Sequence, residues 1–320
     1  MKAEKVFING NIYTMKDDKF HAEALATAGQ EILAVGSTAE VMELFGTDTE
    51  VIALEGKSVI PGLIDSHIHT LIAADMFDKD HLVNCFDKSK EEIVAEVKRL
   101  VEMSQPGEWI QGLGWNQSGW VDTTLPTKEE LDVVSPENPV VLLRVCGHAY
   151  WANSKAVEIA GVTRDTKAPM GGEILKDANG EPTGYFTEKA CDFIGACIPD
   201  LTKEDIMRKF LLIQDYMLEN GVTAYSDKCL GAMSIGHEAP VKATMEALDE
   251  LYSDGQMKVR MNTFIKSAPV MEEIYKEGPK VGLYDGRLTH RGLKLFSDGA
   301  LGARSAWLLE EYNDRPGHTG

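Results

Sequence analysis

Helical and strand-like patterns alternate along much of the chain after residue 58. Apolar residues recur at helical spacing after two capping boxes and twice more further along, and short apolar runs follow the last two of these helices. This alternation is typical of an α/β fold and has the rhythm of a β/α barrel. The predicted helices begin near Ser89, Thr127, Thr202 and Pro240, and the predicted strands cover 222–226, 259–265 and 292–296.

Two regions depart from this rhythm. Residues 1–57 contain short strand-like runs separated by turn signals, which predicts a small β-sandwich domain. Residues 58–320 form the barrel region, with an insertion or lid predicted at about 105–200. The predicted elements are strands at 5–8, 31–35 and 51–54 with a short helix at 39–45 in the first region, and strands at 109–113 and 140–145 with a hairpin at 171–186 in the insertion.

The charge balance excludes several classes of partner. The 320 residues include 32 Lys and Arg against 51 Asp and Glu, and the net charge of −19 would repel a nucleic-acid backbone or an anionic membrane. No segment reaches the roughly eighteen apolar residues of a membrane span, and the first residues do not form a secretory signal. We therefore expect a soluble, cytoplasmic protein. Its five cysteines are widely spaced without a C-x-x-C motif, so we expect them to be reduced and mostly buried.

Two histidines one residue apart give the chain its clearest chemical motif. The apolar segment 58–69 is predicted to be a strand that begins around Pro61 and Gly62, and alternation along it places Asp65, His67 and His69 on one side. Two imidazoles on one rigid strand supply half of a metal coordination shell. On spacing alone, two polar strand residues at a surface would be the more frequent explanation of this pattern.

The context of the pair resembles a known family. Residues 58–69 resemble the first barrel strand of the amidohydrolase superfamily, in which two such histidines bind the more buried metal. The resemblance is to the branch called amidohydrolase family 3, which includes N-substituted formamide deformylase. It implies a TIM-like barrel of the metal-dependent hydrolase type. Further stretches that are similar to this branch are 114–117, 147–154, 171–174, 221–227 and 294–302.

Lys294 is the next candidate. Alternation in the strand predicted at 292–296 places Lys294 and Phe296 opposite Leu293 and Leu295, so the lysine would point into the barrel. The resemblance implies that its neutral amine forms a carbamate that bridges two cations; residue chemistry alone only permits this, and the alternative is an unmodified lysine paired with Asp298. The candidate metal ligands are therefore His67, His69 and Lys294, and the candidate catalytic residues are Lys294 and Asp298.

Substrate-binding candidates lie in the predicted insertion. They are Trp115, Asn116, Arg144 and His148, although a packed or surface role is an equal alternative for His148, and aromatic residues such as Trp115 and Trp120 are more often core. Three carboxylates could orient the metal ligands by hydrogen bonds without touching the metal: Asp65, Asp227 and Asp298. For Asp227 and Asp298, a role in a turn or a helix cap is an equal alternative. The histidines without supporting spacing are expected to be surface or structural residues: His21, His81, His237, His290 and His318.

The resemblance implies a function and leaves an alternative. It implies hydrolysis of an amide or N-substituted formamide C–N bond by a metal-activated hydroxide, with one or two divalent ions, zinc foremost, and a small-molecule amide as substrate. The family's later histidines and its proton-accepting aspartate have no counterpart after Lys294, where only His318 follows, so the chain is expected to cover about the first half of the barrel. The alternative is a truncated or degenerate member with a ligand-binding or regulatory role.

Oligomeric state and a competing fold are the two remaining questions at the level of sequence. A homo-oligomer is compatible with the sequence, which does not specify the oligomeric state. An unrelated α/β oxidoreductase is disfavoured, because no G-x-G-x-x-G follows a predicted strand.

Overall fold

The computed structural model describes residues 2–16, 21–232, 235–236, 239–266, 268–274, 276, 278–299, 301 and 306–320. The chain divides into two compact units, Met1–Ile64 and Asp65–Gly320. The first unit ends seven residues after the boundary that the sequence suggested. His237, one of the histidines named above, lies outside the described residues.

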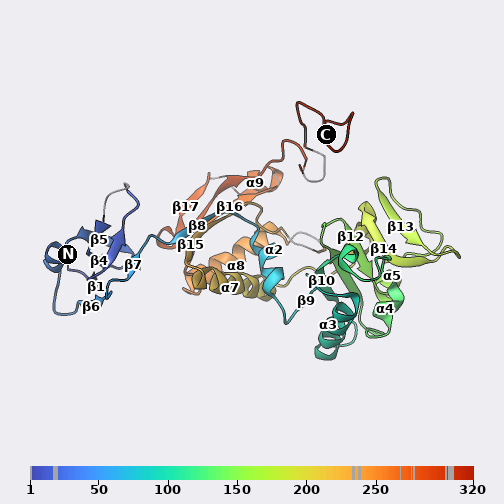
Figure 1. The fold of residues 1–320 in the computed structure, drawn as a ribbon, viewed down its shortest axis with the longest axis horizontal. Helices are drawn as coiled ribbons and strands as arrows, with labels where there is room; N and C mark the ends of the chain where they lie inside the picture. The colour runs from blue at the N-terminus through green and yellow to red at the C-terminus, as the bar shows by residue number, and fades with distance from the viewer. Residues whose placement is uncertain are drawn as a thin grey trace. The chain divides into compact units, whose positions relative to one another are not determined.

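The first unit is built from two small sheets (Figure 1). In one of them β1 pairs with β4 antiparallel and with β6 parallel, and β5 lies outside β4. Its core contains small and β-branched side chains, including Val6, Ala26 and Val41. The elements of the unit are β1 (Lys5–Ile8), β2 (Asn11–Tyr13), β3 (His21–Ala22), β4 (Ala24–Ala28), β5 (Glu31–Gly36), α1 (Thr38–Met42), β6 (Glu50–Ala53) and β7 (Ser58–Val59).

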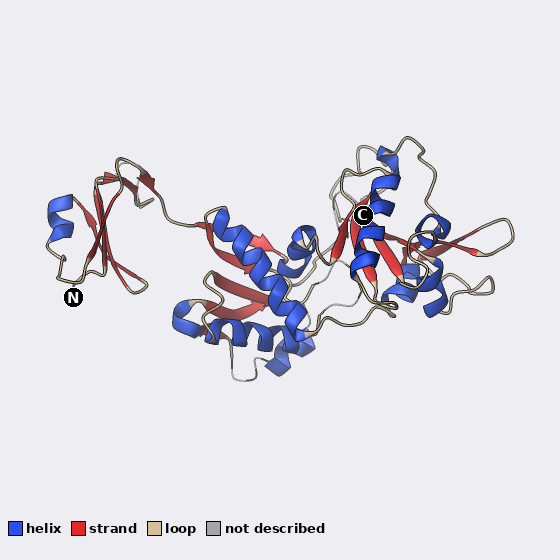
Figure 2. Cartoon of the chain, turned by 90° about the horizontal axis from the view of Figure 1, so that it is seen from below, coloured by secondary structure: helices blue, strands red, loops and turns tan. Residues whose placement is uncertain are grey.

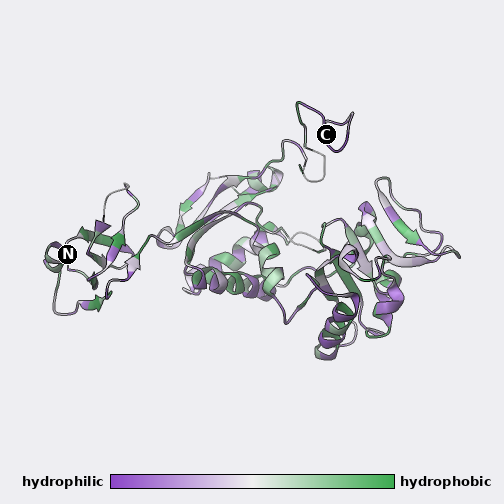
Figure 3. Ribbon diagram, viewed as in Figure 1, coloured by the Kyte–Doolittle hydropathy of each residue, from purple (hydrophilic) through white to green (hydrophobic). Residues whose placement is uncertain are grey.

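A six-stranded sheet in the order β13-β14-β12-β11-β10-β9 forms one part of the second unit. The helix α3 (Lys90–Met103) connects the parallel strands β9 and β10 and packs on them, so this substructure begins earlier than the predicted insertion at about 105. Figure 3 shows hydrophilic and hydrophobic residues together on α3, as an amphipathic helix requires. The remaining elements are β9 (Leu82–Asn84), β10 (Ile110–Trp115), η1 (Gln117–Gly119), α4 (Lys128–Asp132), β11 (Val140–Arg144), β12 (Ala149–Ala152), α5 (Ser154–Ile159), β13 (Gly172–Lys176), β14 (Pro182–Glu188), η2 (Lys189–Cys191) and α6 (Asp192–Gly195).

Three tryptophans fill the core on one face of this sheet. Trp115 and Trp151 are fully buried and Trp120 nearly so. The Trp115 ring lies 5.9 Å from that of Trp120 and 6.1 Å from that of Trp151. Each indole N–H donates to a backbone carbonyl, which removes the cost of burying it. Trp115 and Trp120 are therefore core residues of this sheet.

A five-stranded sheet in the order β17-β18-β16-β15-β8 forms the other part of this unit. Helices lie against the strands (Figure 2), and an apolar core joins them through residues such as Phe210, Leu248 and Met261. The pairs β15–β16 and β16–β18 are parallel, as an α/β fold requires. Its elements are β8 (Leu63–Ile68), α2 (Thr70–Phe77), α7 (Lys203–Glu219), β15 (Val222–Asp227), α8 (Val241–Ser253), β16 (Arg260–Ile265), α9 (Ala268–Ile274), β17 (Lys280–Gly282), α10 (Leu283–Gly286) and β18 (Leu288–Leu293).

The four helices that the sequence predicted begin where it placed them, as α3, α4, α7 and α8. At the predicted capping box before α3, Ser89 accepts from the Glu92 amide, and the Glu92 side chain accepts from the Ser89 amide. Thr202 and Asp205 make the same exchange before α7, where the sequence had marked no box.

The segment 58–69, predicted as one strand, is divided between β7 and β8, which belong to different sheets. β18 covers Leu288–Leu293, whereas the sequence suggested 292–296. Arg291 is an extra residue in β18, because His290 pairs with Thr263 and Gly292 with the next residue of β16. The paired residues end at Leu293, so 294–296 lie beyond the strand.

Candidate metal and substrate site

His67 and His69 lie side by side at the end of β8. Their ring centroids are 5.4 Å apart and the ring planes are nearly perpendicular, at 84°. His69 is still extended, with φ −114° and ψ 99°, and α2 begins at the next residue. The Nδ1 atom of His69 is buried and has no hydrogen-bond partner among the described residues. The predicted alternation therefore brings the two imidazoles together, with a free nitrogen on at least one.

The strand that carries the pair is more exposed than expected. β8 is an edge strand of its sheet, and Leu63 and Ile64 are 52% and 72% exposed. His67 is also exposed, while His69 is half-buried. This exposure arises because β15 is the one strand paired with β8 in the described sheet.

Charges around His69 affect its protonation. Burial lowers the pKa of His69, the nearby Asp227 carboxylate opposes that change, and repulsion by His67 and Lys294 lowers the pKa further. A lowered pKa keeps the imidazole neutral near pH 7, which is the form that binds a metal ion. The same interactions place Asp227 and Lys294 within electrostatic reach of His69.

Asp227, at the end of β15, holds two backbone amides. One oxygen accepts from Thr70 N at 3.2 Å and the other from Cys229 N at 2.9 Å. The residue is 1% exposed, and this burial raises the pKa of its carboxyl. Of the two roles that the sequence allowed, the structure thus shows the capping one directly.

Lys294 follows β18 directly, and its backbone N–H donates to Ile265 O at 2.8 Å. Its Nζ atom lies 5.1 Å from the ring centroid of Phe296, which is itself 67% exposed. Asp298 is exposed and accepts from the Ser297 hydroxyl and the Trp307 amide. No ion pair joins Lys294 and Asp298, both of which belong to the described part of the chain, and the carboxylation of Lys294 stays a prediction.

The donor set near the pair suits part of a metal site. Among the described residues, no group of three His, Cys, Asp or Glu side chains is arranged to hold an ion. However, His69 has a buried Nδ1 atom without a hydrogen-bond partner in the described part of the chain, and a second imidazole lies beside it. A histidine that binds a metal needs such a free ring nitrogen. The two imidazoles, with Lys294 nearby, therefore fit a divalent cation as a partial shell.

The substrate-binding candidates of the six-stranded sheet lie at the ends of its strands. The Arg144 guanidinium donates to Gln117 Oε1 at 2.9 Å and to Asn116 Oδ1 at 3.3 Å, and it stands 5.8 Å from the ring centroid of Trp115. Arg144 and Asn116 are thus brought together above the buried indole. Gln117, which the sequence did not single out, shares this cluster; its place beside Asn116 was the available signal.

His148 forms a second polar pair on this sheet. Its Nδ1 atom lies 3.1 Å from Glu188 Oε2, and the two side chains are 58% and 55% exposed. Glu188 has φ 49° and ψ −128°, a conformation that costs a non-glycine residue free energy. His148 is therefore a surface histidine with an acidic partner that the sequence did not suggest.

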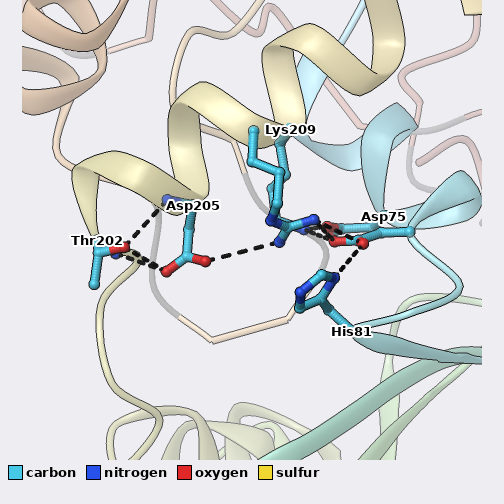
Figure 4. Close-up of polar contacts among 7 residues, drawn as sticks. Asp75, His81, Thr202, Asp205 and Lys209 are labelled. Atoms are coloured by element: carbon cyan, nitrogen blue, oxygen red, sulfur yellow. Dashed lines mark hydrogen bonds and ion pairs between the residues drawn. The ribbon is translucent and has the colours of Figure 1, made fainter.

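An ion network that no sequence motif indicated joins α2 to α7. Lys209 pairs with Asp75, and Arg208 and His81 reach Asp78 at 2.8 Å each (Figure 4). These residues line a cavity of about 830 Å³ with apolar neighbours such as Trp109, and neither His67 nor His69 lines it. His81 thus has a structural role, one of the two that were expected for it.

Comparison with known proteins decides the family. A family model described as "Amidohydrolase family" matches residues 50–320. The chain belongs to this amidohydrolase family. The family expected from the histidine pair and its context is therefore confirmed.

Two curated proteins are similar to this chain over most of its length. Protein LONG AFTER FAR-RED 3 of Arabidopsis thaliana is 33% identical over 322 residues, which cover 99% of this chain and 54% of the relative. N-substituted formamide deformylase of Arthrobacter pascens is 33% identical over 236 residues, which cover 72% of this chain and 43% of the relative.

A solved structure supports an α/β hydrolase-type fold. An uncharacterized metal-dependent hydrolase from Pyrococcus horikoshii OT3 has a TM-score of 0.75 and 28% identity, covering 99% of this chain and 59% of that one. The chain spans about half the length of the curated relatives it matches. No helix in the described part of the chain has the length and apolarity to cross a membrane.

Proposed function

We propose that this amidohydrolase hydrolyses the C–N bond of an amide or an N-substituted formamide, and that the reaction depends on a divalent metal ion, zinc foremost. The observation that carries the proposal is the pair of imidazoles, 5.4 Å apart, with the unpartnered Nδ1 of His69 buried beside them. The formamide substrate class is suggested by the deformylase relative, to which this chain is 33% identical.

His67 and His69 would hold the ion, and Lys294 would join them as a carbamate. One or two bound ions would polarise the carbonyl oxygen and lower the pKa of water so that hydroxide is available near neutral pH. The position of Lys294 supports its role, because its charge affects His69. Carboxylation would convert that repulsion into attraction, since a carbamate carries a negative charge. Asp298, exposed four residues further on, is the second catalytic candidate.

Substrate selection is proposed for Arg144 and Asn116, which lie together, and for His148, which pairs separately with Glu188. Arg144 is held in place by two side-chain hydrogen bonds, so its remaining N–H groups are oriented before a ligand arrives. Trp115 acts from beneath this cluster through its buried ring rather than by direct contact.

The wider context is proposed on the same basis. The five-stranded sheet with its helices would be part of a TIM-like barrel, preceded by the small β domain, in a cytoplasmic enzyme whose partner is a small amide rather than nucleic acid or a membrane. A non-catalytic, ligand-binding role is the second candidate. It is favoured by the finding that the described residues bring no third His, Cys, Asp or Glu ligand to the pair.

Metal analysis and hydrolysis assays test the proposal together. The purified protein should contain zinc or another divalent ion and release amine from members of a panel of N-substituted formamides and simple amides. His67→Ala/His69→Ala should lose both properties. His21→Ala/His318→Ala removes two histidines elsewhere and should keep both. Metal retained by the first double variant contradicts the proposed ligands, and metal binding without hydrolysis supports the ligand-binding candidate.

A further inference from the structure

The helix α2 starts immediately after the histidine pair. Thr70 is its first residue and His69 the residue before it, so any shift of the start of α2 moves the His69 backbone. The preceding strand offers little support, because β8 is an edge strand with exposed Leu63 and Ile64. The side chain of His69 does not cap the helix. What fixes the first turn of α2 therefore also fixes His69.

A buried carboxylate fixes that first turn. Asp227 accepts the Thr70 amide at 3.2 Å through one oxygen, and its other oxygen is occupied by the Cys229 amide at 2.9 Å. A negative charge at a helix N-terminus is also favoured by the helix dipole. In addition, Lys228 N donates to Ile68 O at 2.9 Å, which ties the same end of β15 to the end of β8.

The far end of α2 is anchored separately. Lys209 of α7 is 3% exposed and pairs with Asp75 (Figure 4). The Arg208 guanidinium donates to both carboxylate oxygens of Asp78, at 2.8 Å each. Leu71 and Ala74 pack into the apolar core between these two ends. Because the far end of α2 is held, a displacement caused by a change at Asp227 would act mainly on the first turn of the helix and on His69 before it.

From this geometry we infer that Asp227 is a positioning residue for the metal site: by holding the Thr70 amide it fixes the direction in which His69 presents its imidazole. The inference rests on the proposed function, since it takes His67 and His69 as metal ligands. Asp227 is 1% exposed, accepts a backbone amide at each oxygen, and belongs to no group of three His, Cys, Asp or Glu side chains among the described residues that could hold an ion, so its proposed action is through His69.

Asp227→Asn is the first test. An amide side chain has one acceptor oxygen and cannot serve both backbone donors. The matched control is Asp132→Asn. Asp132 likewise accepts a backbone amide at the start of a helix: Ser154 N, the first residue of α5, donates to it at 2.8 Å. We expect Asp227→Asn to weaken Zn²⁺ binding, measured by chelator competition, by roughly 10- to 100-fold, and Asp132→Asn to leave it within about 2-fold.

A second pair of variants removes the hydrogen bond from the other side. Proline is tolerated at the first position of a helix, where Thr70 lies, so Thr70→Pro deletes the donor and leaves Asp227 intact. Thr70→Val removes the hydroxyl but keeps the amide and serves as its control. We expect the proline variant to weaken Zn²⁺ binding as Asp227→Asn does, and to alter the visible spectrum of bound Co²⁺, while the valine variant preserves both.

The outcomes separate this inference from the function on which it rests. If His67→Ala/His69→Ala abolishes Zn²⁺ binding but neither Asp227→Asn nor Thr70→Pro weakens it beyond its control, the positioning role is refuted and the proposed site stands. If the wild-type protein binds Zn²⁺ no better than His67→Ala/His69→Ala, the proposed site fails and this inference fails with it.

Discussion

His290 is buried in β18 with 1% exposure. Its Nδ1 atom lies 2.6 Å from Thr263 Oγ1, and its Nε2 atom has no partner in the described part of the chain. Burial lowers the pKa of His290 to about 4, an effect that Asp249 of α8 opposes and Lys280 of β17 reinforces. The native protein therefore holds this imidazole neutral at pH 5, where an unfolded chain would protonate it.

The pH dependence of stability follows from this difference. Because the native pKa lies below the unfolded value of about 6.5, the unfolded state binds the additional proton, and stability falls as the pH falls from about 6.5 toward 4. With these two values, the loss between pH 7 and pH 5 is about 2 kcal/mol. Above pH 7 the contribution of His290 should be flat.

The measurement compares wild type with His290→Gln, whose amide can still bond Thr263. Urea unfolding at pH 7, 6 and 5 should show the wild type losing about 2 kcal/mol more than the variant across this range. His21→Gln, a change in the first unit, should follow the wild-type profile. NMR of ¹³C-labelled histidine should show the His290 signal unchanged down to pH 5. Parallel profiles for wild type and His290→Gln would refute the reasoning.

Three further predictions follow from other contacts. Lys209→Met should lower the free energy of unfolding by about 3–5 kcal/mol, because it leaves Asp75 buried without its cation. Lys203→Met, which breaks an exposed pair with Glu250, should change it far less in the same denaturation assay. Trp115→Ala should cost about 3–5 kcal/mol, while Trp307→Ala, at a side chain 77% exposed, should stay within about 0.5 kcal/mol; equal effects would contradict the core assignment. If Lys294 is carboxylated, ¹³C-bicarbonate should give a carbamate NMR signal that Lys294→Arg lacks, and a signal that persists in the variant would assign it elsewhere.

Local signals predicted the starts of helices well. The box Ser89–Glu92 forms the reciprocal hydrogen bonds that its spacing indicated, and at the box Thr127–Glu130 the Thr127 amide and hydroxyl both donate to the Glu130 side chain. A cap depends on four consecutive residues and little else. The histidine pair is similar: alternation along a strand suffices to place His67 beside His69.

Predictions from local sequence were wrong where a strand depends on pairing with a strand far away in the chain. The polar run Thr289, His290 and Arg291 does not read as a strand, yet β18 includes it because β16 supplies the hydrogen bonds. Lys294 consequently lies just beyond β18 instead of in its middle. The helix α2 was not predicted at all, because its Asp75 and Asp78 are buried polar residues that become acceptable only beside Lys209 and Arg208.

The sequence by itself determined the family, the pairing of His67 with His69 and the starts of four helices, since each depends on residues that are neighbours in the chain. The tertiary structure decided that β8 is an exposed edge strand, that Asp227 holds the start of α2, and that Trp115 belongs to the core. Which side chains are buried, and which distant charges form pairs, depends on how helices and strands pack against one another. A short stretch of residues does not contain that information.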